Sequence, residues 1–106
     1  MTHHDARRQL VDFLERKAFR PVMRADEADF PEGKRSRLKD LQESTRKEIE
    51  RFHHYRSAEE VVTNFRRDLT SEPAKKVHRA LKDLGLPTLD DVREEFEKLA
   101  ERVGQR

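Results

Sequence analysis

Apolar residues recur at intervals of three and four along most of this chain, the spacing that lines one face of an α-helix. The pattern predicts five helices, at residues 2–19, 33–56, 58–69, 72–84 and 89–103. No stretch alternates between apolar and polar residues with the Val and Ile enrichment typical of a strand, so no sheet is expected. The predicted fold is all-α, a single domain over residues 1–106 that forms a small bundle of about five helices.

Local sequence signals mark the ends of several of these helices. Ser57 and Glu60 match a capping box, in which a hydroxyl and a carboxylate satisfy free amides at a helix start. Ser71 provides a similar start for the helix at 72–84, and Gly85 followed by Pro87 ends it. These signals agree with the apolar periodicity, and together they indicate a chain that specifies a folded structure.

The segment at about residues 20–33 has no sustained periodicity and is expected to form a long irregular connection. Arg20–Pro21 is expected to end the first helix, because proline lacks an amide donor and disfavours helical conformation in the preceding residue. Irregular segments of this length are unusual in a small domain, which favours a role in binding or in covering the core.

The helical faces carry large rings that are expected at the centre of a shared core. Each predicted helix except the fourth has one inward-facing phenylalanine: Phe13, Phe52, Phe65 and Phe96. The helix at 33–56 would be about 33 Å long, so it either bends or extends beyond the others. If its far end extends, the candidate interface residues are Phe52, Tyr55 and Arg56, since tyrosine and arginine are common interface anchors.

Composition limits the chemistry that this chain can carry. Of its 106 residues 43% are charged, yet 24 Lys and Arg against 22 Asp and Glu leave a formal charge of only +2. Such a mixed surface does not by itself predict a nucleic-acid partner. The absence of cysteine excludes disulfides and thiol nucleophiles. No apolar run approaches the length of a membrane span or of a signal-peptide core, so a cytoplasmic location without a membrane partner is expected.

One helical face is strongly basic. The residues that point away from the apolar face of the helix at 72–84 are Lys75, Lys76, Arg79 and Lys82. This helix follows its predecessor after a short connection, as in a helix-turn-helix, but it offers no Asn or Gln to read base edges. Two interpretations stay open. The face is either a solvated cationic surface or a nucleic-acid or anion-binding site. Lys34, Arg35 and Arg37 would contribute to that site if the fold brings them close to the basic face.

Two residues have the spacing of metal ligands. Glu50 and His53 match the Glu-x-x-His motif of carboxylate-bridged di-iron bundles, but such a site needs two motifs and further carboxylates. Only a symmetric dimer of this chain could complete it. Surface residues are the simpler interpretation, and no cofactor is expected. His78 borders the apolar face of its helix and is expected to be a half-buried packing residue.

No catalytic constellation is found. The notable hydroxyls, those of Ser57, Ser71 and Thr88, are accounted for as helix caps. The sequence therefore predicts a non-enzymatic, small intracellular helical module for protein interaction or regulation, whose partner is another protein or a second copy of the chain. Nucleic-acid or anion binding through the basic face is the alternative, and a metal-binding bundle completed by dimerisation is the third interpretation.

Overall fold

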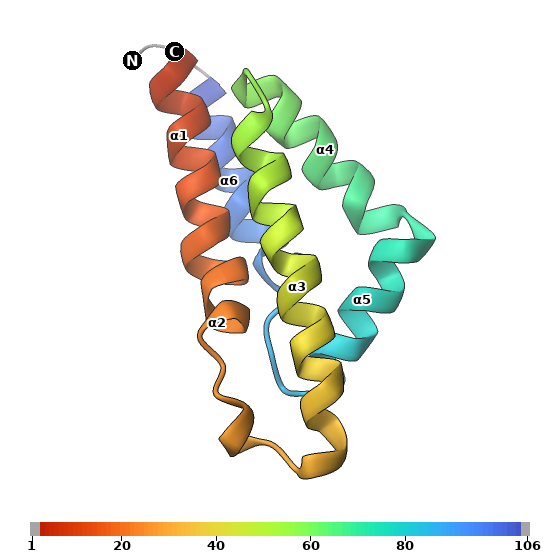
Figure 1. Ribbon diagram of the computed structural model, residues 1–106. Helices are drawn as coiled ribbons and strands as arrows, with labels where there is room; N and C mark the ends of the chain where they lie inside the picture. The colour runs from red at the N-terminus through yellow and green to blue at the C-terminus, as the bar shows by residue number, and fades with distance from the viewer. Residues whose placement is uncertain (1–2, 105–106) are drawn as a thin grey trace.

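The computed structural model describes residues 3–104, and these residues form an all-α fold that is 85% helical and has no strand. Five helices are present, as the apolar periodicity predicts (Figure 1). The first is built from α1 (His3–Leu14), a π-helical turn at Glu15–Phe19 and α2 (Arg20–Met23). The others are α3 (Glu32–His54), α4 (Ala58–Thr70), α5 (Glu72–Asp83) and α6 (Arg93–Gly104).

The sequence predicts that the first helix ends before Pro21, but the helix continues for one more turn to Met23. Proline interrupts an α-helix because it lacks an N–H and its ring collides with the carbonyl four residues earlier. The π-helical turn lies directly before this position, and its wider hydrogen bond runs from the N–H of Arg20 to the oxygen of Glu15. One extra residue in that turn changes the register ahead of Pro21, so the helix accommodates the ring and continues.

The irregular connection is therefore shorter than expected, and polar contacts order it. It covers residues 24–31 and includes a 3-10 turn at Glu27–Asp29, whose start is capped by the side chain of Asp26. The side-chain amide of Gln42, on α3, donates to the carbonyl oxygens of Val22 at 3.1 Å and Ala25 at 3.0 Å. A side chain from α3 thus adds hydrogen bonds to the backbone oxygens with which the first helix ends.

The predicted hydroxyl caps form, but the Glu60 carboxylate accepts from the N–H of Arg56 and not from that of Ser57 as a capping box requires. The Ser57 hydroxyl accepts a hydrogen bond from the Glu60 N–H at 3.1 Å, and the Ser71 hydroxyl accepts one from the Ala74 N–H at 3.3 Å. Gly85 adopts a left-handed conformation with φ of 74°, which places the Leu86 N–H 2.9 Å from the Leu81 oxygen and closes α5. These contacts explain why sharp bends separate α3, α4 and α5.

Buried apolar side chains form two clusters. The larger, the aromatic cluster, joins α1, α4, α6 and the end of α3, and contains the rings Phe13, Phe19, Phe52, Phe65 and Phe96. At its centre, the rings of Phe65 and Phe96 stack with their centroids 4.0 Å apart. The smaller, the aliphatic cluster, joins α2, the first half of α3 and α5 through Val22, Leu38, Leu41, Leu81 and Leu84. The two clusters occupy opposite ends of the molecule.

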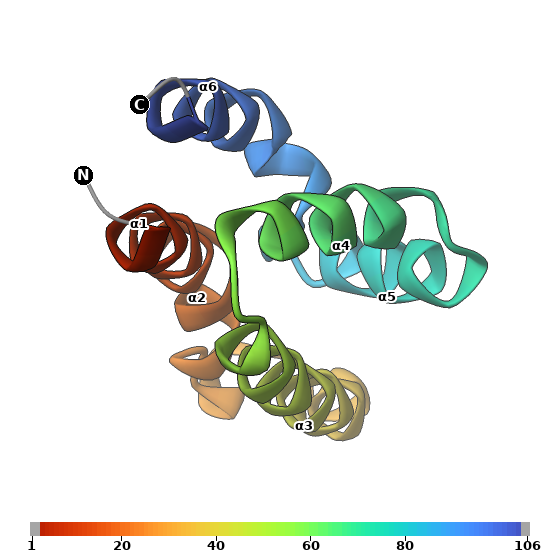
Figure 2. The same cartoon turned by 90° about the horizontal axis from the view of Figure 1, so that it is seen from above.

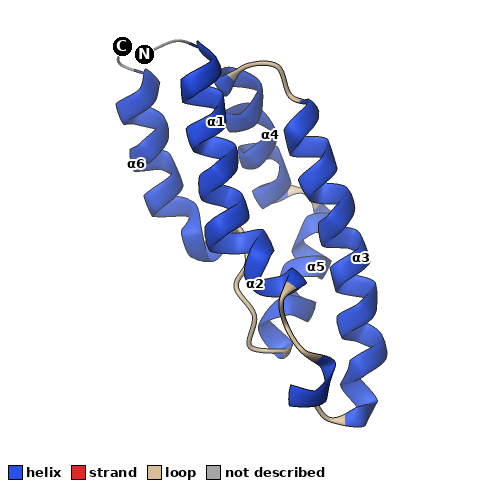
Figure 3. Ribbon diagram, turned by 60° about the vertical axis from the view of Figure 1, so that its left-hand side comes forward, coloured by secondary structure: helices blue, strands red, loops and turns tan. Residues whose placement is uncertain are grey.

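The helices are arranged in an elongated bundle with extents of 48 × 23 × 21 Å. Viewed from above, α1 and α4 lie between α6 and α3 (Figure 2). The start of α1 and the end of α6 lie at one end of the bundle, and the start of α3 extends beyond the other helices at the opposite end (Figure 3). The long helix α3 therefore projects at its beginning and not at its end.

Candidate functional site

A pocket of about 200 Å³ opens where the aromatic and aliphatic clusters meet. Its walls are the middle of α3, the end of α4, the inner face of α5 and the loop that follows Pro87. Phe19 and Val22, at the end of the first helix, contribute apolar surface. The pocket exists because only Ser71, in extended conformation, separates α4 from α5. The chain bends there, and the space inside the bend faces α3.

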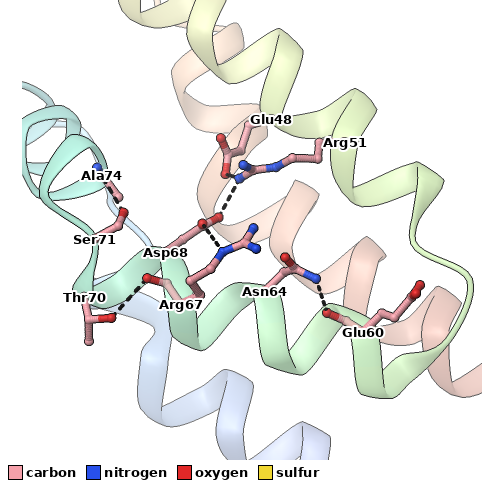
Figure 4. A network of polar contacts seen from close by, with 9 residues as sticks. All are labelled: Glu48, Arg51, Glu60, Asn64, Arg67, Asp68, Thr70, Ser71 and Ala74. Carbon is pink, nitrogen blue, oxygen red and sulfur yellow. Dashed lines mark hydrogen bonds and ion pairs between the residues drawn. The ribbon is translucent and has the colours of Figure 1, made fainter.

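Three charged side chains meet in this pocket (Figure 4). Arg51 of α3 donates from Nη2 to Oδ2 of Asp68 on α4, at 2.6 Å, and the same nitrogen contacts the carboxylate of Glu48 one turn earlier on α3. The side chain of Asp68 is only 9% exposed. A buried carboxylate without a partner is costly, so the guanidinium of Arg51 is required where it lies.

The pocket holds more negative than positive groups. Two carboxylates, those of Glu48 and Asp68, share the guanidinium of Arg51. Arg67 adds only a weak contact, with Nε 3.8 Å from Oδ1 of Asp68, and its side chain is mostly exposed. Burial, reinforced by the neighbouring Asp68, raises the pKa of Glu48 to about 7, although Arg51 acts in the opposite direction. Near neutral pH, Glu48 is therefore divided between its protonated and ionised forms.

His78 lines the same pocket from α5 and is half-buried, as its position in the sequence indicates. Burial lowers the pKa of His78, and this effect outweighs attraction from the carboxylates of Asp90, Asp68 and Asp91. The imidazole is accordingly neutral at neutral pH. Hydroxyls from Ser44, Thr45, Ser71 and Thr88 and apolar groups from Val77, Leu81 and Leu89 complete much of the lining.

One residue in the sequence, Asp68, indicates this site, although it lies within an otherwise apolar pattern. Asp68 occupies the position three residues after Phe65, on the inward face of α4, where the period calls for an apolar residue. Its partners Glu48 and Arg51 lie one turn apart on α3, a spacing that normally indicates an exposed ion pair. A charged residue on an apolar face is the feature that identifies a buried polar site.

The basic face of α5 lies outside the pocket. Lys76, Arg79 and Lys82 are exposed, and within residues 3–104 no carboxylate lies at ion-pair distance from them. Lys75 lies 3.8 Å from the carboxylate of Glu72, one turn earlier. This surface is therefore exposed to solvent.

The start of α3 brings further cations to the end of α5. The ammonium of Lys34 lies 3.4 Å from the Asp83 carbonyl oxygen, and Nη1 of Arg37 lies 3.4 Å from the Asp83 carboxylate. Arg35 turns away and donates to the carbonyl oxygens of Glu27 and Phe30. Two of the three cations at the start of α3 thus adjoin the basic face.

Phe52 is predicted as part of an interface at the end of α3, but its side chain is fully buried in the aromatic cluster. Tyr55 is half-buried with its ring edge-on to Phe52, at 5.1 Å between centroids, and only Arg56 of the three is exposed. Arg7 of α1 donates to the carbonyl oxygens of His53 and Tyr55. Because the core and α1 cover this end of α3, it does not project as an interface.

Glu50 and His53 have separate partners. Glu50 pairs with Arg46 at 2.8 Å, and the His53 ring contacts the carboxylate of Glu15. Among residues 3–104, no three His, Asp or Glu side chains are grouped as a metal site requires. Both residues therefore have the surroundings of surface ion pairs.

No described helix combines the length and the apolar character needed to cross a bilayer. Comparison with family models, curated proteins and solved structures finds no match to this chain.

Proposed function

We propose that this chain is a non-enzymatic protein-interaction module, and that its partner docks over the pocket and inserts one side chain. The observation that carries the proposal is the pocket itself, in which buried charges lie beside apolar walls. At about 200 Å³ it is smaller than the roughly 300–1,000 Å³ of typical small-molecule sites. A volume of this size suits a single anchoring side chain.

The rigidity of the surrounding elements supports this function. The walls belong mainly to helices, and the bend at their junction is held by the cap of Ser71 on α5. Preformed pockets of this kind receive anchor residues without the entropic cost of ordering a loop. A central side chain in a desolvated pocket, surrounded by polar residues, is the usual arrangement of an interaction hot spot.

Selection from a peptide display library tests the proposal. Peptides selected on the natural chain are compared with an Ala74→Phe variant, in which a ring enters the pocket from α5, and with Ala28→Phe, which adds the same ring to an exposed position elsewhere. Circular dichroism verifies that both variants are folded. We expect Ala74→Phe to weaken binding at least tenfold and Ala28→Phe to leave it unchanged.

Mapping of amide resonances on the unmodified chain provides the same answer without a variant. Bound peptides should shift resonances around Thr45, Ser71 and Thr88, which line the pocket. A library that yields no saturable binder, or binders that shift only residues outside the pocket, would contradict the proposal. Light scattering that shows a dimer, dissociated by Ala74→Phe, would identify a second copy of the chain as the occupant instead of a separate partner.

A second candidate function, nucleic-acid or anion binding, is favoured by the proximity of Lys34 and Arg37 to the basic face of α5. Duplex DNA is titrated into the chain at two salt concentrations. Binding that weakens steeply with salt, and that is lost in a variant with Lys76→Glu and Arg79→Glu, would support this function over the first. No binding at low salt would exclude it.

A further inference from the structure

We infer that the pocket receives the alkylammonium group of a lysine-type side chain, with the ammonium held against the carboxylates of Glu48 and Asp68. The inference rests on the proposed function, because it names the chemistry of the side chain that the partner inserts. Three features of the pocket carry it: its balance of charge, the geometry of the groups already paired, and its apolar wall.

The charge balance favours a cation. Glu48 and Asp68 compete for the same Nη2 nitrogen of Arg51, so one carboxylate lacks a full counter-charge when both are ionised. The exposed guanidinium of Arg67 compensates little at 3.8 Å. An incoming cation supplies the missing charge, whereas an anion would add to the excess of negative charge beside the buried Asp68.

The geometry favours an ammonium over a guanidinium. One planar guanidinium, that of Arg51, already lies between the two carboxylates. A second would need another pair of parallel hydrogen bonds to the same oxygens. An ammonium is compact and directs three donors outward, so it can use single lone pairs on each carboxylate and the hydroxyls nearby.

The rest of the lining matches an alkyl stem. Phe19, Val22, Val77 and Leu81 provide apolar surface beside the charged group, as the methylene chain of lysine requires. His78, the other titratable group from α5, is neutral at neutral pH because burial lowers its pKa, so it does not repel a cation. The pocket therefore combines an anionic group with an apolar wall.

Ionisation of the pocket makes this binding depend on pH. Burial and Asp68 raise the pKa of Glu48 to about 7, and a bound cation favours the ionised form, so binding releases a proton below that pH. The groups that act on Glu48 are Arg51 on α3 and Asp68 on α4. Arg67 contacts Asp68 from α4, and His78, which titrates below its usual range, lines the same pocket from α5. Protonation of either Glu48 or His78 disfavours a cation, so affinity should rise by roughly tenfold between pH 6 and pH 8.

Titration of the full chain with pentylammonium chloride tests the inference by resonance shifts and calorimetry. The matched probes are 1-pentanol, which has the same stem without charge, and pentanoate, which has the opposite charge. We expect saturable binding of pentylammonium alone, with shifts near Thr45, Ser71 and Thr88. Glu48→Gln should weaken it several-fold and reduce its pH dependence to the part that His78 contributes, while Glu43→Gln, on the exposed side of α3, should leave both unchanged.

Several results would overturn the inference. These are equal binding of pentanol, preferential binding of pentanoate, or unchanged ammonium affinity in Glu48→Gln. Failure here is distinguishable from failure of the proposed function. Peptides that bind at the pocket but have no lysine in common would refute the inference and leave the proposed interaction module intact. Binding of pentylammonium at the pocket, with no peptide that binds there, would support the inference and contradict the proposed function.

Discussion

The two ends of this bundle are built differently. Five of the six phenylalanines lie in the aromatic cluster, where rings from α1, α3, α4 and α6 fill the interior. The aliphatic cluster contains only Val and Leu among its fully buried members, and beside it the bend at Ser71 leaves the pocket open. The difference teaches that the large rings gather at one end and fill it, and that space for another molecule remains where this end meets the aliphatic cluster.

The largest effect should come from the aromatic cluster. Phe65→Ala should reduce the free energy of unfolding by about 3 to 5 kcal/mol, because Phe65 has no exposed surface and stacks on Phe96. Urea denaturation followed by circular dichroism measures the loss. A decrease below about 1 kcal/mol would show that the rings are not the main source of stability.

A matched truncation in the aliphatic cluster should cost less. Leu38→Ala should lower the free energy of unfolding by about 2 to 3 kcal/mol, in the lower part of the range for buried leucine, because neighbouring aliphatic chains can move into the space. Hydrogen exchange should increase in α5 and the first half of α3 and stay slow in α1 and α6. Uniform acceleration would mean that the two ends unfold as one unit.

The effect of Glu48 on the free energy of unfolding should depend on pH. The folded-state pKa of Glu48, about 7, exceeds its ordinary value of 4.5, so the associated stability is full below pH 4.5 and lost as the pH rises through 7. The Glu48→Gln variant has no carboxyl group to ionise at this position. It should be more stable than the natural chain by about 2 kcal/mol at pH 8, a value reduced for the partial exposure of Glu48. At pH 4.5 the two chains should be equally stable. Thermal melts between these pH values measure the difference.

His78 contributes with the opposite sign, since its lowered pKa gives stability that is present above pH 6.5 and lost as the pH falls. The histidine is present in both chains, so its contribution cancels in the comparison. A Glu48→Gln chain that shows the same advantage at both pH values would disprove the raised pKa of Glu48.

The smallest effect on stability concerns the turn at the end of α5, which leads toward α6. Gly85→Ala should cost about 1 kcal/mol, because φ of 74° is unfavourable for a residue with a Cβ although no atom lies within 4 Å of it. Gly33→Ala, in the first turn of α3 at the same end, should instead be neutral or stabilising. Chemical denaturation of the pair measures both, and equal effects would refute the conformational explanation.

The sequence predicted the architecture well because helices are specified locally. Apolar spacing predicted all five helices, and the caps at Ser57, Ser71 and Gly85 placed their ends near the observed residues. The buried positions of Phe13, Phe52, Phe65 and Phe96 also followed from spacing. The exception was Pro21, where a π-helical turn directly before the proline changes the register and the helix continues, an outcome that no residue pattern indicates.

The candidate site could not be predicted in the same way. Glu48 and Asp68 are twenty residues apart, and although Asp68 interrupts the apolar face of α4, nothing on either helix indicates that the two meet until the bend at Ser71 brings α4 against α3. The interface prediction for Phe52 was wrong for the same reason, since the packing of α1 decides which end of α3 is covered. Contacts between helices depend on crossing angles that are set by the whole core.

The sequence by itself thus determined the helices, their caps and the side chains that turn inward, because these follow from interactions within a few residues. Only the tertiary structure decided which charges became buried, which carboxylate lost its full counter-ion and where the interior remained unfilled. Those properties arise from solvent exclusion between segments distant along the chain, and solvent exclusion is a consequence of packing.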